Sequence, residues 1–173
     1  MARLSYVEKE NARPEQEKIL SQLTQRSGKI ANIWKLWSHS PVTLEMFMAF
    51  YKTLMKGTLD GKLRELAYIK TSLLNDCAYC AEAHKGVARK IGVTEQQIQE
   101  IGSYESSALF SPVEKLVLKY AEELTRTAKS SESLIHELKK HLSEEQLVEL
   151  NLTVGTANLT NRFNMSFMTD MDS

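Results

Sequence analysis

Residues 62–91, KLRELAYIKTSLLNDCAYCAEAHKGVARKI, contain the most informative pattern of this chain. Leucine and isoleucine recur at helical spacing over residues 63–74, which indicates a helix. Asn75 and Asp76, two residue types favoured at helix N-termini, separate this stretch from a second helical pattern over residues 77–91, before Gly92. Because the link is so short, the two helices are expected to form an antiparallel hairpin.

The two cysteines of the chain, Cys77 and Cys80, lie three positions apart at the start of the second predicted helix, and His84 follows one turn later. On a helix these three positions share one face. Free amides and the helix dipole favour a thiolate in the first turn. His84 could accept the proton of Cys80 directly or through water. The pattern therefore indicates thiol chemistry or metal binding.

Glu65 is the residue best placed to orient His84. It lies eleven residues before Asp76, and His84 lies eight residues after it. At about 1.5 Å per residue, both side chains start roughly 12–16 Å from the turn, so they could face each other across the hairpin. A carboxylate that orients an imidazole beside a thiol is a common nucleophile–base arrangement, and we predict a Glu–His–Cys relay.

The rest of the chain is rich in helix signals and poor in strand signals. Thr94 and Ser143 each begin a capping-box pattern, with Gln three positions later, and Ser111-Pro112 begins a further helix. Helices are also expected from Pro14, from Pro41 and over residues 132–142. A chain of 173 residues fits one domain with a substantial core. The sequence therefore predicts a single all-α domain over residues 1–173.

Composition narrows the functional classes. The formal net charge is zero, which gives no support to nucleic-acid or acidic-membrane partners. There is no apolar run of membrane-spanning length, no signal-peptide stretch at the N-terminus and no phosphate-binding glycine loop. We therefore expect a cytoplasmic protein without a cofactor or a bound metal. In that compartment a Cys-x-x-Cys pair is more often catalytic, redox-sensing or metal-binding than a structural crosslink.

The combined spacing of Glu65, Cys77, Cys80 and His84 resembles the signature of alkyl hydroperoxidase D-like proteins of the carboxymuconolactone decarboxylase-like superfamily. The local resemblance covers residues 40–102. It implies an all-helical homo-oligomer, a trimer or hexamer, in which a helical hairpin carries the motif. It also implies an antioxidant peroxidase that reduces a hydroperoxide through a cysteine pair, with a dithiol or lipoyl-type reductant as partner.

By position, the resemblance implies that Cys80 is the attacking thiolate and Cys77 the resolving cysteine, with His84 and Glu65 as the proton relay. The best-known family pattern has a histidine directly before the second cysteine, where this chain has Tyr79. A phenol is a poor base near neutral pH but can donate a hydrogen bond, so Tyr79 could modulate the site.

Other functions stay open on the sequence alone. A carboxymuconolactone decarboxylase-type lyase needs acid–base groups and no dithiol, so the cysteines argue against it. A non-enzymatic redox sensor would use the same cysteine pair. A zinc-stabilised interaction module would have Cys77, Cys80 and His84 as three ligands, with no obvious fourth. The apolar residues of 44–55 and the Asn-, Met- and Phe-rich residues 158–168 offer surface for self-association.

Overall fold

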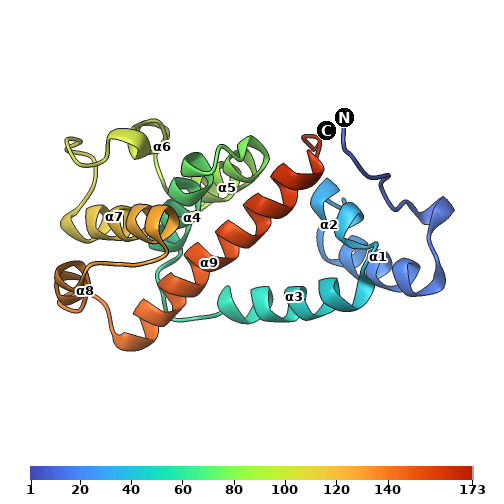
Figure 1. Cartoon of the computed structure of the whole chain (residues 1–173), viewed down its shortest axis with the longest axis horizontal. Coiled ribbons are helices and arrows are strands. Elements are labelled where there is room, and N and C mark those ends of the chain that lie inside the picture. Colours follow the sequence, from blue (N-terminus) through green and yellow to red (C-terminus); the bar gives the residue numbers. More distant parts are fainter. Residues whose placement is uncertain (173) are drawn as a thin grey trace. The chain divides into compact units, whose positions relative to one another are not determined.

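The computed structural model describes residues 1–172, except for the side chains of residues 26 and 27, and every regular element in that part is helical (Figure 1). The α-helices in chain order are α1 Pro14–Ser27, α2 Asn32–Trp37, α3 Pro41–Leu54, α4 Gly61–Leu74, α5 Ala78–Lys90, α6 Glu95–Glu100, α7 Pro112–Thr127, α8 Glu132–Leu138 and α9 Glu144–Phe167. Two short 3-10 helices, Lys9–Asn11 and Ile101–Ser103, complete the elements. The all-α prediction is confirmed.

The two predicted capping boxes, at Thr94 and Ser143, are present, and the predicted helix start at Ser111 has one as well. Thr94, Ser111 and Ser143 accept a hydrogen bond from the backbone N–H three residues later, at 3.1, 3.4 and 3.2 Å. The side chain of the third residue bonds back in each case. Helix α8 is shorter than predicted, ending at Leu138. After Leu138 the chain continues as tighter turns, in which the N–H groups of Lys140 and His141 donate to carbonyl oxygens three residues earlier.

The chain divides into two compact units, and the single-domain prediction stays a prediction. The first unit comprises Met1–Thr53 and Asn164–Ser173. Its helices α1, α2 and α3 contribute a small apolar cluster that includes Ile19, Leu23 and Leu44. Within this unit the N-terminal segment pairs with the C-terminal segment, since the Tyr6 hydroxyl donates to Asp170 at 3.0 Å.

The second unit, Leu54–Phe163, is built around α4. Residues 63–72 of this helix are all buried. One side packs on α7 and α9, in a cluster that includes Leu63, Val117 and Leu150. Leu66 and Ile69 belong to a second cluster with residues of α5, α6 and α7. Buried polar groups require partners, and several polar side chains of α4 bond to residues of neighbouring helices.

Lys70 of α4 illustrates this requirement. Its buried ammonium group pairs with Glu122 of α7 at 2.9 Å and lies 4.7 Å from the centre of the Tyr104 ring. The hydrogen bond from Lys70 holds the pKa of the Glu122 carboxyl below its ordinary value. A group whose pKa is lowered on folding stabilises the fold above its unfolded pKa, and this contribution disappears as the pH falls through its folded pKa.

Replacing Glu122 by glutamine is therefore expected to destabilise the protein by about 2 kcal/mol at neutral pH, because Lys70 loses its anionic partner. This is less than for a fully buried pair, since the Glu122 side chain is 29% exposed. The difference in free energy of unfolding should begin to shrink as the pH falls below about 4.3, the pKa of an unperturbed glutamate. It should disappear once Glu122 of the folded parent, whose pKa is lower, is also neutral. Urea unfolding of parent and variant, from neutral pH to below the pKa of glutamate, measures this difference, and Glu137→Gln at an exposed position is the control. A pH-independent difference would exclude the ion pair as its cause.

Candidate active site

The turn between α4 and α5 places both cysteines. Helix α4 ends at Leu74, and Asp76 adopts a left-handed backbone conformation with φ of 55°. The N–H of Cys77 donates to the carbonyl of Ser72 at 2.9 Å, and Cys77 becomes the N-cap of α5. Its sulfur accepts a hydrogen bond from the N–H of Cys80 at 3.4 Å. The expectation that Asn75 or Asp76 would cap this helix is wrong, because the left-handed turn moves the cap one residue further.

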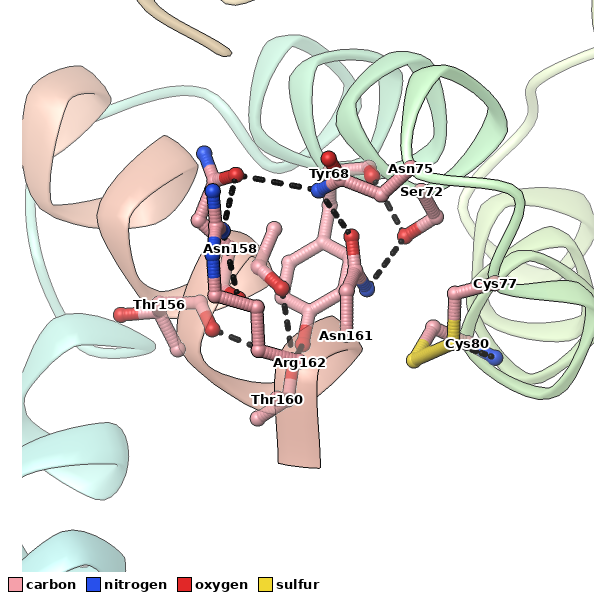
Figure 2. Close-up of a disulfide and its surroundings, with 11 residues drawn as sticks. Tyr68, Ser72, Asn75, Cys77, Cys80, Thr156, Asn158, Thr160, Asn161 and Arg162 are labelled. Carbon is pink, nitrogen blue, oxygen red and sulfur yellow. Dashed lines mark hydrogen bonds between the residues drawn. A yellow bond between two sulfur atoms is a disulfide. The ribbon is translucent and has the colours of Figure 1, made fainter. Parts of the chain in front are cut away.

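A disulfide joins Cys77 and Cys80 (Figure 2). Their Cα atoms lie 5.4 Å apart, within the ordinary range for bridged cysteines. Both residues are buried. The sequence therefore predicts correctly that the two sulfurs approach each other, because an N-cap and the third residue of a helix project to the same side of the first turn.

Glu65 and His84 meet across the hairpin, as the sequence predicts. Oε2 of Glu65 lies 2.7 Å from Nδ1 of His84. The Glu65 side chain is buried and the imidazole is largely buried. Because a carboxylate accepts hydrogen bonds, it favours the form in which Nδ1 carries a proton. Nε2 of the neutral ring is then the nitrogen available to take up a proton.

Tyr68 is a site residue that the sequence reasoning missed. Its buried ring stacks on the His84 imidazole, with a centroid distance of 3.4 Å and an interplanar angle of 12°. Its hydroxyl hydrogen-bonds to Thr160 of α9. Glu65 and Tyr68 therefore restrain the imidazole at its edge and at its face. The available signal was the spacing, since Tyr68 lies one turn after Glu65 and must share its side of α4.

A second missed feature is a network of amide side chains beside the disulfide (Figure 2). Asn75 donates to Asn158 at 3.0 Å and to Asn161 at 2.9 Å, and Asn161 donates to the Ser72 hydroxyl at 3.1 Å. Asn161 is fully buried. These hydrogen bonds connect α9 to the C-terminal end of α4 and to the turn that precedes Cys77. The amides of Asn158 and Asn161 bond within their own chain, and the self-association surface predicted over residues 158–168 stays a prediction.

Tyr79 lies in the first turn of α5, between the cysteines, and is buried. Within the described residues, no group of three or more His, Cys, Asp and Glu side chains is arranged to hold a metal ion. Likewise, no helix of residues 1–172 is both long and apolar enough to cross a membrane.

The site thus combines a cysteine pair at a helix start with a carboxylate-oriented imidazole one turn later. Such a site can exchange two electrons between dithiol and disulfide, and it can move protons through His84. The fold and site together define a helical protein with a buried Cys-x-x-Cys hairpin.

This chain belongs to the carboxymuconolactone decarboxylase family. Residues 41–123 match the model of that family, and this range includes the whole α4–α5 hairpin. A Bacillus subtilis (strain 168) protein, the uncharacterised YdfG, is 31% identical over 129 residues. The alignment covers 73% of this chain and 88% of YdfG.

Solved structures share the fold. The core of an AhpD alkylhydroperoxidase described as an uncharacterised peroxidase-related protein of Ralstonia eutropha superposes with a TM-score of 0.85 and 20% identity. The superposition covers 99% of this chain and 93% of that one. A peroxidase-related protein of a Silicibacter species gives a TM-score of 0.84 and 22% identity, over 99% and 92% of the two chains. The predicted helical architecture of the alkyl hydroperoxidase D-like type is thereby confirmed.

Proposed function

We propose that this protein is a thiol-dependent peroxidase and disulfide oxidoreductase that reduces hydroperoxides through Cys77 and Cys80. The observation that carries the proposal is the 2.7 Å contact of Glu65 with His84, on the same hairpin that holds the cysteine pair. A structural disulfide would need no such buried acid–base pair one turn away. The descriptions of the Ralstonia and Silicibacter proteins as peroxidase-related support the same chemistry.

The proposed reaction begins with both cysteines reduced. His84 takes the proton of Cys80, and the Cys80 thiolate attacks the terminal oxygen of the hydroperoxide, breaking the O–O bond. The alkoxide leaves and is protonated to the alcohol, while Cys80 becomes a sulfenic acid. The thiol of Cys77 then attacks the Cys80 sulfur, and the sulfenic hydroxyl leaves as water. The product is the Cys77–Cys80 disulfide, which is the form seen in the structure.

A dithiol or lipoyl-type reductant would supply two electrons and two protons to restore both thiols, forming its own disulfide. In this scheme Glu65 orients His84 and stabilises the imidazolium, and Tyr68 holds the ring in place. Tyr79, where the best-known family pattern has a histidine, modulates the site. A cytoplasmic location, where such dithiols are kept reduced, and a homo-oligomeric state, a trimer or hexamer, complete the proposal.

The proposal predicts that the reduced protein loses two free thiols together on addition of one equivalent of an alkyl hydroperoxide, and that dihydrolipoamide restores them. Mass spectrometry of the alkylated protein detects the two protected thiols, and peroxide consumption with several dithiols measures turnover. If both thiols stay alkylatable after excess hydroperoxide, the proposal fails. A disulfide that forms without any dithiol supporting turnover would instead identify a redox sensor.

Family membership and the Glu65–His84 pair also favour a second candidate, a carboxymuconolactone decarboxylase-type lyase. That reaction needs proton transfer and no electron transfer, so the cysteines would be dispensable. The variant Cys77→Ser/Cys80→Ser separates the two candidates: a lyase should keep its activity on a carboxymuconolactone, whereas a thiol peroxidase should lose all activity on hydroperoxides. The zinc-stabilised interaction module is tested by measuring the zinc content of the purified protein, which should be one ion per chain if that alternative holds.

A further inference from the structure

Helix α9 has two apolar faces, only one of which packs against its own chain. Leu150, Val154 and Ala157 lie in the core with no exposed surface. On the opposite side, Val148 is 59% exposed and Leu159 is 50% exposed. An exposed apolar row along a long helix marks an interaction surface more often than an isolated apolar residue does.

The exposed row is regular over residues 145–162, a length of about 26 Å. We define the α9 stripe as Glu145, Val148, Leu152, Gly155, Leu159 and Arg162, all of which are exposed. The positions alternate between steps of three and four residues, which is the spacing of a seam between two helices. An acidic residue occupies one end of the stripe and a basic residue occupies the other.

The α9 stripe is complementary to itself in one orientation. If a second α9 runs antiparallel about a two-fold axis midway between residues 153 and 154, Val148 faces Leu159 of the second copy. Leu152 then faces Gly155, and Glu145 faces Arg162. Each pair occurs twice, so the charges are matched at both ends of the contact. A parallel pair in register would instead place Glu145 against Glu145 and Arg162 against Arg162.

Two local features fit this pairing. A Cβ atom added to Gly155 would meet nothing within 4 Å, so the space above this residue is open to a Leu152 side chain from a second copy. Glycine inside a helix is unfavourable by roughly 0.5–1 kcal/mol relative to alanine, and close helix approach is a reason to keep it. The Arg162 guanidinium donates to the carbonyl oxygen of Asn158 at 3.0 Å and to its side-chain oxygen at 2.6 Å, which orders it in advance of binding.

We propose that α9 of this protein pairs antiparallel with α9 of a second copy through the α9 stripe, forming a two-fold symmetric interface. A two-fold contact needs a self-complementary patch, and the stripe has the required apolar centre and oppositely charged ends. The interface adjoins the proposed peroxidase site through Asn158, which bonds both Arg162 and Asn75. The pairing itself does not depend on the reaction that the site performs.

Sedimentation velocity of purified full-length protein tests the proposal with two lysine variants. Leu152→Lys places two like charges close to the two-fold axis and should halve the mass of the assembly. Met46→Lys on α3 is the matched control, because Met46 is a 70% exposed apolar residue of a different helix, and its assembly should keep the parental mass. The proposal is overturned by an assembly that survives Leu152→Lys, by a parent trimer, which has no two-fold axis, or by a parent that stays monomeric across micromolar concentrations.

A charge exchange tests the register. Glu145→Arg and Arg162→Glu should each weaken the pairing, because each places like charges opposite one another at both ends. An equimolar mixture of the two variants should form the mixed pair. In that pair the two introduced side chains face each other at one end of the contact, and the native Arg162 of one copy faces the native Glu145 of the other copy at the opposite end. Circular dichroism confirms that both variants are folded. If the mixture associates no better than either variant alone, the antiparallel register is wrong.

Discussion

Replacing Cys80 by serine is expected to abolish hydroperoxide consumption, whereas replacing Cys77 by serine is expected to leave a sulfenic acid trapped on Cys80. The expectation follows from the positions of the two residues. His84 lies one turn after Cys80, so the base that activates a thiol serves Cys80. Cys77, joined to Cys80 in the oxidised form, is placed to resolve the sulfenic acid and form the disulfide.

A sulfenate-specific probe followed by mass spectrometry distinguishes the two roles. The probe should label Cys80 in the Cys77→Ser variant after one equivalent of hydroperoxide, and it should label neither residue in the parent at the end of the reaction. Labelling of Cys77 in the Cys80→Ser variant, with none in the converse variant, would reverse the assignment.

Replacing Glu65 by glutamine is expected to slow peroxide turnover about tenfold or more, on the scale of losing a group that orients a catalytic base. The Glu65 carboxylate lies 2.7 Å from Nδ1 of His84, and glutamine keeps a hydrogen-bond acceptor on the side chain but deletes the negative charge. Without that charge the imidazolium formed beside the Cys80 thiolate is less stable. The midpoint of Cys80 alkylation against pH should therefore move upward.

The matched control is Glu82→Gln, which removes a charge from an exposed residue of α5 that pairs with Lys85. It should leave both the alkylation midpoint and turnover unchanged. Because Glu65 is buried, circular dichroism and urea unfolding must show that Glu65→Gln remains folded under assay conditions. A folded Glu65→Gln protein with the parental midpoint and rate would mean that Glu65 has no part in the relay.

Much of this hairpin could be predicted because its determinants are local. The 3.6-residue period identified α4 as a helix, and Thr94, Ser111 and Ser143 marked three further helix starts. Similar distances from a short turn predicted that Glu65 lies opposite His84 without any knowledge of the rest of the fold. These inferences need only helix geometry and a two-residue link.

Other features of the site could not be predicted in this way. The stacking of Tyr68 on His84 depends on the angle and distance between α4 and α5, which the packing of larger side chains determines. The bonds of Asn161 to Ser72 and Asn75 join residues more than 80 positions apart. Amides such as these occur at many surface positions, so their burial gives no signal in a single sequence.

By itself, the sequence determined the helical architecture, the hairpin, the approach of the two sulfurs and the facing of Glu65 and His84, because all of these follow from periodicity and short-range spacing. Only the tertiary structure decided which polar residues are enclosed. In the folded chain Asn75, in the turn before Cys77, hydrogen-bonds to α9. On the opposite side of α9, Val148, Leu152 and Leu159 are exposed. The reason is that burial depends on contacts between helices distant in the chain, whereas the helices themselves depend on contacts within a turn.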